Sequence, residues 1–327
     1  MKEKFKLKDI WHLVKEASIG FSDDKVIKLS GSLAYFTIFS IGPMLIVIMF
    51  FADLFWGREA IEGTIYGQIN GFVGSDAAAQ IQGIIKNVTL SGSTITTIIG
   101  FITLLIGATT VFAEIQDSIN TIWNLKAKPE KGWLQMIMSR LLSFSIVVGL
   151  AFLLLVSLIM NGLLEALGDR LVTMFPQVAV IIIYIFNLVI TLAVITFLFA
   201  VIFKVLPDAK IKWRDVWVGS IVTALLFMLG KFAMTFYIGK SDVGSTYGTA
   251  GALVVLLLWV YFSSIILYFG AEFTKVFAAQ YGSRIHPSQY AVWIKHIEVE
   301  EGKGTLKHQE EKKKEENNST DDKIKVT

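Results

Sequence analysis

The chain has 327 residues, of which 54% are hydrophobic and 17% are charged, and its formal net charge is +3. Soluble domains carry about 25% charged residues; the mean hydropathy of +0.61 and several apolar runs of about 20 residues instead indicate a polytopic membrane protein. The sequence contains no cysteine, which excludes disulfides and thiolate metal sites.

The first 28 residues are rich in lysine and are predicted to form a cytoplasmic N-terminal segment, 1–28. No signal-peptide cleavage pattern follows, so the first apolar run is expected to remain as the first membrane span. Apolar residues recur among the lysines at helical spacing, at Ile10, Trp11, Val14, Ala17 and Phe21. This pattern predicts an amphipathic helix, which either lies on the inner membrane interface or packs under the helix bundle.

Six apolar stretches are long enough to cross a bilayer as helices, so residues 29–280 are predicted to form a transmembrane domain. The second stretch is short and rich in threonine. The predicted spans are Leu33–Phe55, Ile95–Ala113, Leu141–Leu163, Val178–Phe203, Val216–Tyr237 and Ala250–Phe273.

Lysine and arginine gather in every second segment that flanks these spans. Basic residues are retained on the cytoplasmic side of a membrane, so both termini are expected in the cytoplasm and the loops 56–94, 164–177 and 238–249 outside. The loop 56–94 contains two sets of apolar residues at helical spacing, separated by a capping signal at Ser75 and Asp76. It therefore predicts an outer amphipathic helical hairpin.

Residues 281–327 are expected to form a cytoplasmic C-terminal segment, which becomes too polar to bury a core and is disordered from about residue 298. The sequence thus predicts an all-α fold. It is a polytopic membrane protein with six transmembrane helices, an N-terminal interfacial helix and the outer hairpin.

The ionisable residues of the spans lie near their ends. At a rise of about 1.5 Å per residue, Lys231 falls near the outer interface, and Glu114 and Glu272 fall near the inner one. An uncharged middle layer argues against a proton-coupled pump with a buried carboxylate relay and against a charge-ringed channel. It is compatible with a lipid-like substrate, and equally with no transport.

Polar residues inside the spans are few and mild. Asn187, Ser263 and Ser264 are expected to bond between helices. Pro43 either bends the first span or interrupts it, and an interrupted helix exposes backbone groups to a substrate.

Residues that would carry chemistry are missing from the sequence. None of the four histidines stands in an H-E-x-x-H or another metal-ligand spacing, and no P-loop, dinucleotide fingerprint or nucleophile elbow occurs. The lysines follow membrane topology rather than a nucleic-acid-binding face. We therefore expect no catalytic, cofactor or metal residues, no enzyme activity and no nucleic-acid partner.

Four motifs together resemble the YihY/virulence factor BrkB family of bacterial inner-membrane proteins, in that family's order and spacing. They are SLAYFTIFSIGP (32–43), GATTVFAEIQDSINTIW (107–123), LPDAKIKWRDVWVGSIVTALLFMLGKF (206–232) and STYGTAGALVVLLLWVYFSSIILYFGAEF (245–273).

The resemblance implies a six-helix, multi-pass protein of the bacterial cytoplasmic membrane, linked to envelope functions, with export or transport often suggested. The family's older label, ribonuclease BN, is regarded as a misassignment, and no catalytic residue is implied. The positions that match the family are Tyr35, Pro43, Glu114, Gln116, Asp117, Asn120, Trp123, Pro207, Asp208, Trp213, Asp215, Tyr247, Gly248, Gly251 and Glu272.

Helical spacing groups several of these positions. Glu114 and Asp117 share one helix face, beside a strip formed by Gln116 and Asn120. With Glu272 they are expected to form an inner-face cluster with basic partners such as Lys212 or Arg214. The cluster is either a polar staple between helix ends, or a cytoplasmic gate or headgroup site.

At the outer face, Gly244 and Gly248 have a small-xxx-small spacing that allows close helix approach, and Tyr247 is placed as an interfacial anchor. A re-entrant or unwound start of the sixth span is the alternative to close packing.

Two functions remain open. The first is a transporter-like protein that moves a lipid or another amphipathic envelope molecule. The second is a non-transporting scaffold for envelope assembly. Membrane lipids and envelope proteins are the expected partners, and the sequence leaves the oligomeric state undetermined.

Overall fold

The computed structural model describes seven parts of the chain: residues 9–40, 107, 110–128, 176–240, 247, 251–289 and 291–294, with gaps between them. The described helices belong to the compact unit Met1–Val292. Several predictions fall outside the described residues: the third span, the outer hairpin 56–94, Pro43, Gly248, the side chain of Asn187 and the tail from residue 298.

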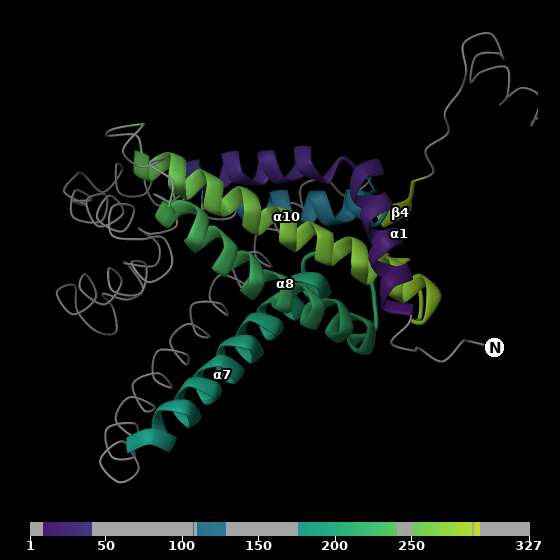
Figure 1. Ribbon diagram of the computed structural model, residues 1–327. Helices are drawn as coiled ribbons and strands as arrows, with labels where there is room; N and C mark the ends of the chain where they lie inside the picture. The colour runs from purple at the N-terminus through teal and green to yellow at the C-terminus, as the bar shows by residue number, and fades with distance from the viewer. Residues whose placement is uncertain are drawn as a thin grey trace, which may run out of the picture. The chain divides into compact units, whose positions relative to one another are not determined.

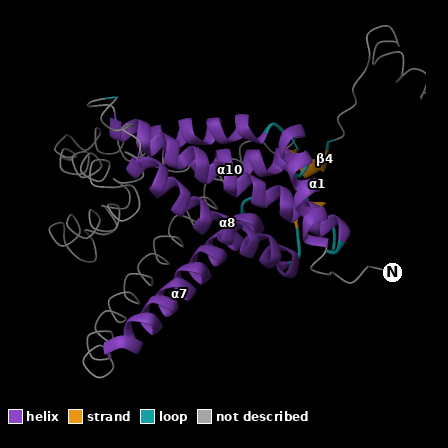
Figure 2. Cartoon of the chain, in the orientation of Figure 1, coloured by secondary structure: helices purple, strands orange, loops and turns teal. Residues whose placement is uncertain are grey.

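Within the described residues, three helices are long and apolar enough to cross a membrane. They coincide with the predicted fourth, fifth and sixth spans: α7 (Pro176–Val205), α8 (Trp213–Lys240) and α10 (Gly251–Gln280). At 1.5 Å per residue each exceeds the hydrocarbon core of about 30 Å. Figure 2 shows that the described chain is almost entirely helical.

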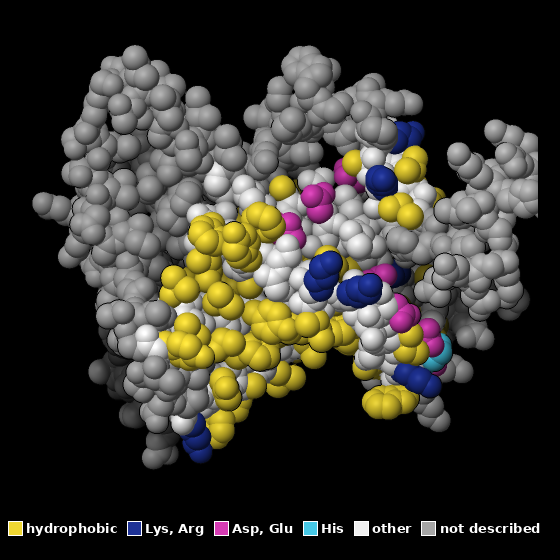
Figure 3. Space-filling view, turned by 90° about the horizontal axis from the view of Figure 1, so that it is seen from above, with side chains coloured by type: hydrophobic (Ala, Val, Ile, Leu, Met, Phe, Trp, Pro, Cys, Tyr) yellow, Lys and Arg dark blue, Asp and Glu magenta, His cyan; other side chains and the backbone are white. Residues whose placement is uncertain are grey.

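Exposed apolar side chains on these helices are consistent with a lipid environment. On α8 the residues Ile221, Leu225, Leu229, Phe232 and Phe236 are exposed and recur at helical spacing, so they form one apolar stripe. In Figure 3 hydrophobic side chains cover a broad area, and most charged side chains on this face gather to one side of it. Exposed patches of this kind mark membrane or interaction surfaces.

Two shorter helices correspond to parts of the first two predicted spans. The apolar helix Val26–Ser40 begins at Val26 rather than at Leu33. The helix 110–122 continues past the predicted end of the second span at Ala113. The polar residues that follow Ala113 therefore lie on this helix and not in a loop after it.

The N-terminal helix α1 (Asp9–Asp23) packs against α10. Its Leu13 and Ala17 are fully buried with Phe273 and Phe277 of α10, and Figure 1 shows α1 crossing the last part of that helix. Trp11, on the predicted apolar face, remains 77% exposed. The helix itself is thus present and packed, whereas its place at a membrane interface stays a prediction.

Two helices end in the same way, with a non-glycine residue in the left-handed region two positions past the last helical residue. These residues are Lys25 after α1 and Asn124 after the helix 110–122, with φ of 53° and 55°; Arg284, also left-handed with φ of 58°, lies four positions past the end of α10. A left-handed residue at this position terminates a helix and lets the chain turn. The turn at Lys25 separates α1 from the helix Val26–Ser40.

The α8 and α10 helices lie side by side and antiparallel (Figure 1), with Gly219 near Thr274 and Gly230 near Ile266. We call the end of this pair where α8 begins and α10 finishes the polar end, and the opposite end the far end. The later part of α7 also contacts α8, through Phe197 and Trp217 among others. The main core includes the fully buried Trp123, Phe203 and Tyr268.

Short strands modify the all-α prediction. Strand β2 (Ala209–Lys210) pairs antiparallel with β3 (His286–Pro287), with Ala209 opposite Pro287. Strand β1 (Leu125–Ala127) pairs with β4 (Ala291–Trp293). These ladders connect the segments that leave α7 and the helix 110–122 to the segment after α10, a long-range pairing that no local pattern predicted.

Candidate functional site

Asp208 is the centre of a polar cluster between the helix 110–122 and the loop after α7. Its Oδ2 accepts hydrogen bonds from Gln116 Nε2 at 3.3 Å and from Asn120 Nδ2 at 3.0 Å. The backbone N–H of Asp208 donates to Asn120 Oδ1 at 2.9 Å, and its carbonyl accepts from the N–H of Ser288 at 2.9 Å. One residue therefore joins three segments of the chain.

The predicted strip of Gln116 and Asn120 thus has a partner, but one that differs from the expected set. Asp117 is exposed, and its carbonyl accepts from the hydroxyl of Thr121 at 2.8 Å. Glu272 faces α1 and pairs with Lys275, rather than joining Glu114. The structure therefore divides the expected single cluster into two separate polar sites.

Asp215 makes a second tie at the polar end. It lies in the first turn of α8, is buried, and its Oδ2 accepts from the N–H of Ser283 at 2.8 Å and from its hydroxyl at 2.7 Å. A Cβ on Gly282 would lie 2.6 Å from Asp215 Cγ, so only glycine fits there. A carboxylate in the first turn also stabilises α8 through the helix dipole.

Trp123 anchors the helix 110–122 to α10. Its buried indole Nε1 donates to the carbonyl of Ala271 at 3.0 Å. A helical carbonyl normally accepts only from its own helix. This additional bond fixes the position of the helix 110–122 along the axis of α10.

Glu272 lies in a buried site between α1 and α10. Its side chain is 1% exposed, and its Oε2 is 3.4 Å from Nζ of Lys275, which lies 2.8 Å from Oδ2 of Asp24. A Cβ on Gly20 would lie 2.7 Å from Glu272 Oε2, so the carboxyl rests directly on α1. The predicted sixth span ends at Phe273, but α10 continues to Gln280.

Sequence reasoning missed Gly20 and Asp24 as members of this site. The two residues are four apart, so α1 and the turn after it present them on one face. That spacing was visible in the sequence, but only the packing of α1 on α10 identifies it as the cover of a carboxyl group.

Towards the polar end, α8 and α10 approach each other closely through two reciprocal glycine–threonine contacts. A Cβ on Gly219 would lie 1.9 Å from Thr274 Oγ1, and one on Gly270 would lie 2.0 Å from Thr223 Oγ1. Each threonine hydroxyl donates at 2.7 Å to the carbonyl of the glycine four residues earlier in its own helix. The hydroxyls are thus satisfied within their helices, and the glycines make the room for them.

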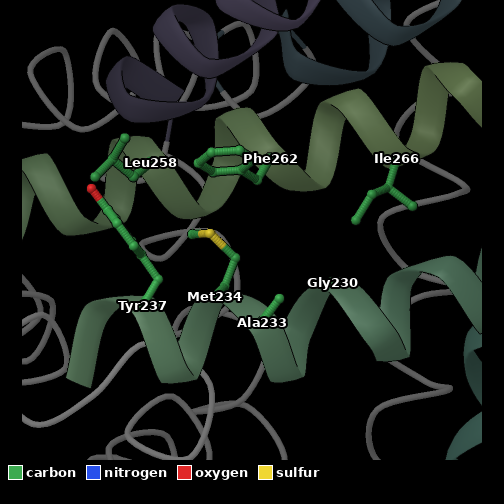
Figure 4. Close-up of a pocket in the computed structure, with 7 residues that line it drawn as sticks. All are labelled: Gly230, Ala233, Met234, Tyr237, Leu258, Phe262 and Ile266. Carbon is green, nitrogen blue, oxygen red and sulfur yellow. The ribbon is translucent and has the colours of Figure 1, made fainter. Parts of the chain in front are cut away.

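Towards the far end the same two helices line a partly open cavity of about 310 Å³. We call it the α8–α10 cavity. Figure 4 shows side chains from both helices directed toward it. Among the described residues that line it, Tyr237 alone contributes a hydroxyl group. The lining residues are Gly230, Ala233, Met234, Tyr237, Leu258, Phe262 and Ile266.

The other predicted positions are dispersed. Tyr35 is exposed on the helix Val26–Ser40 and packs on Phe39, with ring centroids 4.8 Å apart. Tyr247 is also exposed. Ser264 is buried, but its hydroxyl donates to the carbonyl of Val260 in its own helix at 2.6 Å, rather than to another helix; the adjacent Ser263 is half-buried.

The membrane-length helices, their exposed apolar stripe and the polar ties at one end define a helical membrane protein. A family model described as "Virulence factor BrkB" matches residues 17–291. The match covers most of the chain and includes α1 from Ala17, both polar sites and the α8–α10 cavity. The chain therefore belongs to the virulence factor BrkB family.

Curated relatives bear the name UPF0761 membrane protein. The protein of Tolumonas auensis is 27% identical over 267 residues, covering 77% of this chain and 80% of the relative. That of Pseudoalteromonas atlantica is 26% identical, covering 77% and 81%. That of Stenotrophomonas maltophilia is 25% identical, covering 83% and 60%. No solved structure matches the chain.

Proposed function

We propose that this BrkB-family membrane protein binds a lipid or another amphipathic envelope molecule in the α8–α10 cavity and moves it between the leaflets of the bacterial inner membrane. The observation that carries the proposal is the cavity itself, an apolar space between two helices of membrane-crossing length. The proposed topology is multi-pass, with both termini in the cytoplasm.

The lining of the cavity favours hydrocarbon over a polar solute. A polar group transferred into it would lose its hydrogen bonds to water, which costs about 1–3 kcal/mol on protein-derived scales. An acyl chain loses nothing comparable, since it leaves one apolar environment for another and gains contacts with side chains such as Leu258, Phe262 and Ile266. The volume lies at the lower end of the range for ligand pockets, about 300–1,000 Å³.

The end of α8 offers groups suited to a lipid headgroup. Tyr237 combines an apolar ring in the cavity lining with a hydroxyl, as interfacial tyrosines do. Lys240 follows in the last turn, with its Nζ 4.4 Å from the ring centroid of Phe236. A cation at this position attracts anionic headgroups, so the proposed molecule has its tail in the cavity and its headgroup near the far end.

The test is a pair of tryptophan substitutions on α8. Ala233→Trp fills the cavity, whereas the matched control Leu229→Trp places the same ring on the exposed apolar stripe. Each purified protein is reconstituted with a phospholipid that carries a photoreactive group in its acyl chain. Cross-linked peptides are mapped, and the transfer of fluorescent phospholipid between leaflets is measured.

The expected result is cross-linking to α8 and α10 in the unsubstituted protein and in Leu229→Trp, with loss of both cross-linking and transfer in Ala233→Trp. Cross-linking without transfer in the unsubstituted protein would favour the scaffold, with lipid as a structural component. Absence of cross-links to α8 and α10 would reject the cavity as a lipid site.

A further inference from the structure

We infer that Glu272 and Asp24 form a proton-binding site that holds α1 on α10. The inference rests on the buried geometry of these groups and does not depend on the proposed lipid function. One proton from the water at the polar end binds to the pair when α1 is in place, and it returns to water when α1 detaches.

The charges of the site do not balance when every group is ionised. The carboxylates of Glu272 and Asp24 contribute two negative charges and Lys275 one positive charge, so one negative charge is in excess. Glu272 is the most deeply buried of the three, 1% exposed against 17% for Asp24 and 27% for Lys275. An uncompensated carboxylate at that depth is costly, and binding of one proton removes the excess charge.

Hydrogen-bond geometry assigns the proton to Glu272. Lys275 lies 2.8 Å from Asp24 but 3.4 Å from Glu272, and charge-assisted N–H···O bonds have lengths of about 2.7–2.9 Å. Within the described part of the chain, neither Glu272 oxygen has a hydrogen-bond donor. The Asp24 carboxyl is the neighbour of the Glu272 carboxyl, since an oxygen of each lies within 3.4 Å of the Lys275 amino group. Two carboxyl groups bond to each other only through a proton, so a protonated Glu272 donates to Asp24, whose charge Lys275 balances.

Few charged groups face Glu272 in the described residues. From α1 and its C-terminal turn the facing group is Asp24, and from α10 it is Lys275. The helix 110–122 approaches α10 here with the neutral indole of Trp123, while its acidic residues Glu114 and Asp117 act on Tyr268. The proton balance of the site is therefore set by Glu272, Asp24 and Lys275.

The position of α1 couples the proton to docking. The Glu272 carboxyl rests on Gly20, and Leu13 and Ala17 of α1 are buried beside it. Once α1 detaches, Glu272 meets water, where a glutamate has a pKa of about 4.3. Above that pH, the protein with α1 docked thus binds one more proton than the protein with α1 detached. Docking must weaken as pH rises, by up to about tenfold per pH unit until the docked site also loses its proton.

The chain has no cysteine, so single cysteines can report docking. Ala17→Cys places a thiol in the buried contact, and Ser18→Cys places one on the exposed side of the same helix. Both proteins are purified in detergent and labelled with a small maleimide across a range of pH. The ratio of the two labelling rates cancels the ionisation of the thiol.

The expected ratio of the Ala17→Cys labelling rate to the Ser18→Cys labelling rate is low at acid pH. It rises by up to about tenfold per pH unit above the pH where docking begins to weaken. Glu272→Gln, whose amide can donate to Asp24 as the protonated acid does, should keep the ratio low at every pH. Glu16→Gln removes a carboxyl from α1 outside the site and should leave the rise intact. A flat ratio in the unsubstituted background, or a rise that persists in Glu272→Gln, would overturn the proposal.

A second measurement covers the case in which Glu272→Gln does not fold. The infrared pH-difference spectrum of the protein without substitutions should contain the carbonyl band of a protonated carboxyl that disappears as pH rises and α1 detaches. Asp24→Asn, which removes one of the two carboxyls, should remove or shift that band. A spectrum without a protonated carboxyl under conditions in which α1 is docked would contradict the site directly.

Discussion

The two halves of the α8–α10 interface use the same helices and similar residues but pack in opposite ways. Towards the polar end, Gly219 and Gly270 each receive a threonine side chain, and the helices are in close contact. Towards the far end, Gly230 meets only the end of the Ile266 side chain, and a cavity of about 310 Å³ remains. A glycine therefore brings helices together only where the partner helix supplies a side chain that fills the space.

The same substitution should have opposite consequences in the two halves, and the largest effect is expected for Gly270→Ala. The new Cβ would lie 2.0 Å from Thr223 Oγ1 and 2.8 Å from its Cβ, so one helix must move. We expect a loss of about 3 kcal/mol in the free energy of unfolding, the upper part of the range for overpacked cores. Denaturant titration of the purified protein measures it.

Gly31→Ala is the control for that measurement. Nothing lies within 4 Å of a Cβ at Gly31 on the helix Val26–Ser40, so only the higher helix propensity of alanine should count, and stability should rise slightly. Equal losses in Gly270→Ala and Gly31→Ala would show that the tight half of the interface has been misidentified.

A smaller loss is expected when a polar tie at the polar end is broken. Asp208→Ala leaves the amides of Gln116 and Asn120 without their shared acceptor. A hydrogen bond to a charged group contributes about 1.5–3 kcal/mol, so we expect a loss of about 2 kcal/mol, and hydrogen exchange should increase in the helix 110–122. A double-mutant cycle of Asp208→Ala with Asn120→Ala should give strong coupling, and additive effects would contradict the proposed tie.

The smallest effect is expected for Gly230→Ala in the far half. Its Cβ would lie 2.4 Å from Ile266 Cδ1, the mobile end of a side chain that borders the cavity. Since the Ile266 side chain can rotate into the cavity, little steric strain remains. That strain offsets only a small part of the stability gained from the higher helix propensity of alanine. The change in unfolding free energy should stay below about 1 kcal/mol. A loss as large as that of Gly270→Ala would mean that the cavity cannot accept the displaced side chain.

The sequence predicted what depends on local composition. Hydropathy located α7, α8 and α10 because each must be apolar along its length to be stable in lipid. Spacing by four residues placed Gln116 and Asn120 on one face. Their partner Asp208 could not be inferred, because it lies 88 residues beyond Asn120 and no periodicity relates the two segments.

The close-packed glycines of the structure were not predicted. Close approach was predicted for Gly244 and Gly248, which lie outside the described residues, and the observed contacts use Gly219 with Thr274 and Gly270 with Thr223. Glycine and threonine four residues apart are visible in the sequence of each helix. Whether they meet a neighbour depends on how far the two helices slide along each other, and that register is fixed by contacts between residues distant in sequence.

By itself, then, the sequence determined that the chain is a helical membrane protein, because the cost of placing polar groups in lipid acts on every residue of a span separately. Only the tertiary structure decided that Glu272 lies under α1 instead of at a helix end, and that α8 and α10 are tight at one end and hollow at the other. These features depend on which surfaces meet, and a pair of surfaces is a property of the folded chain rather than of either segment.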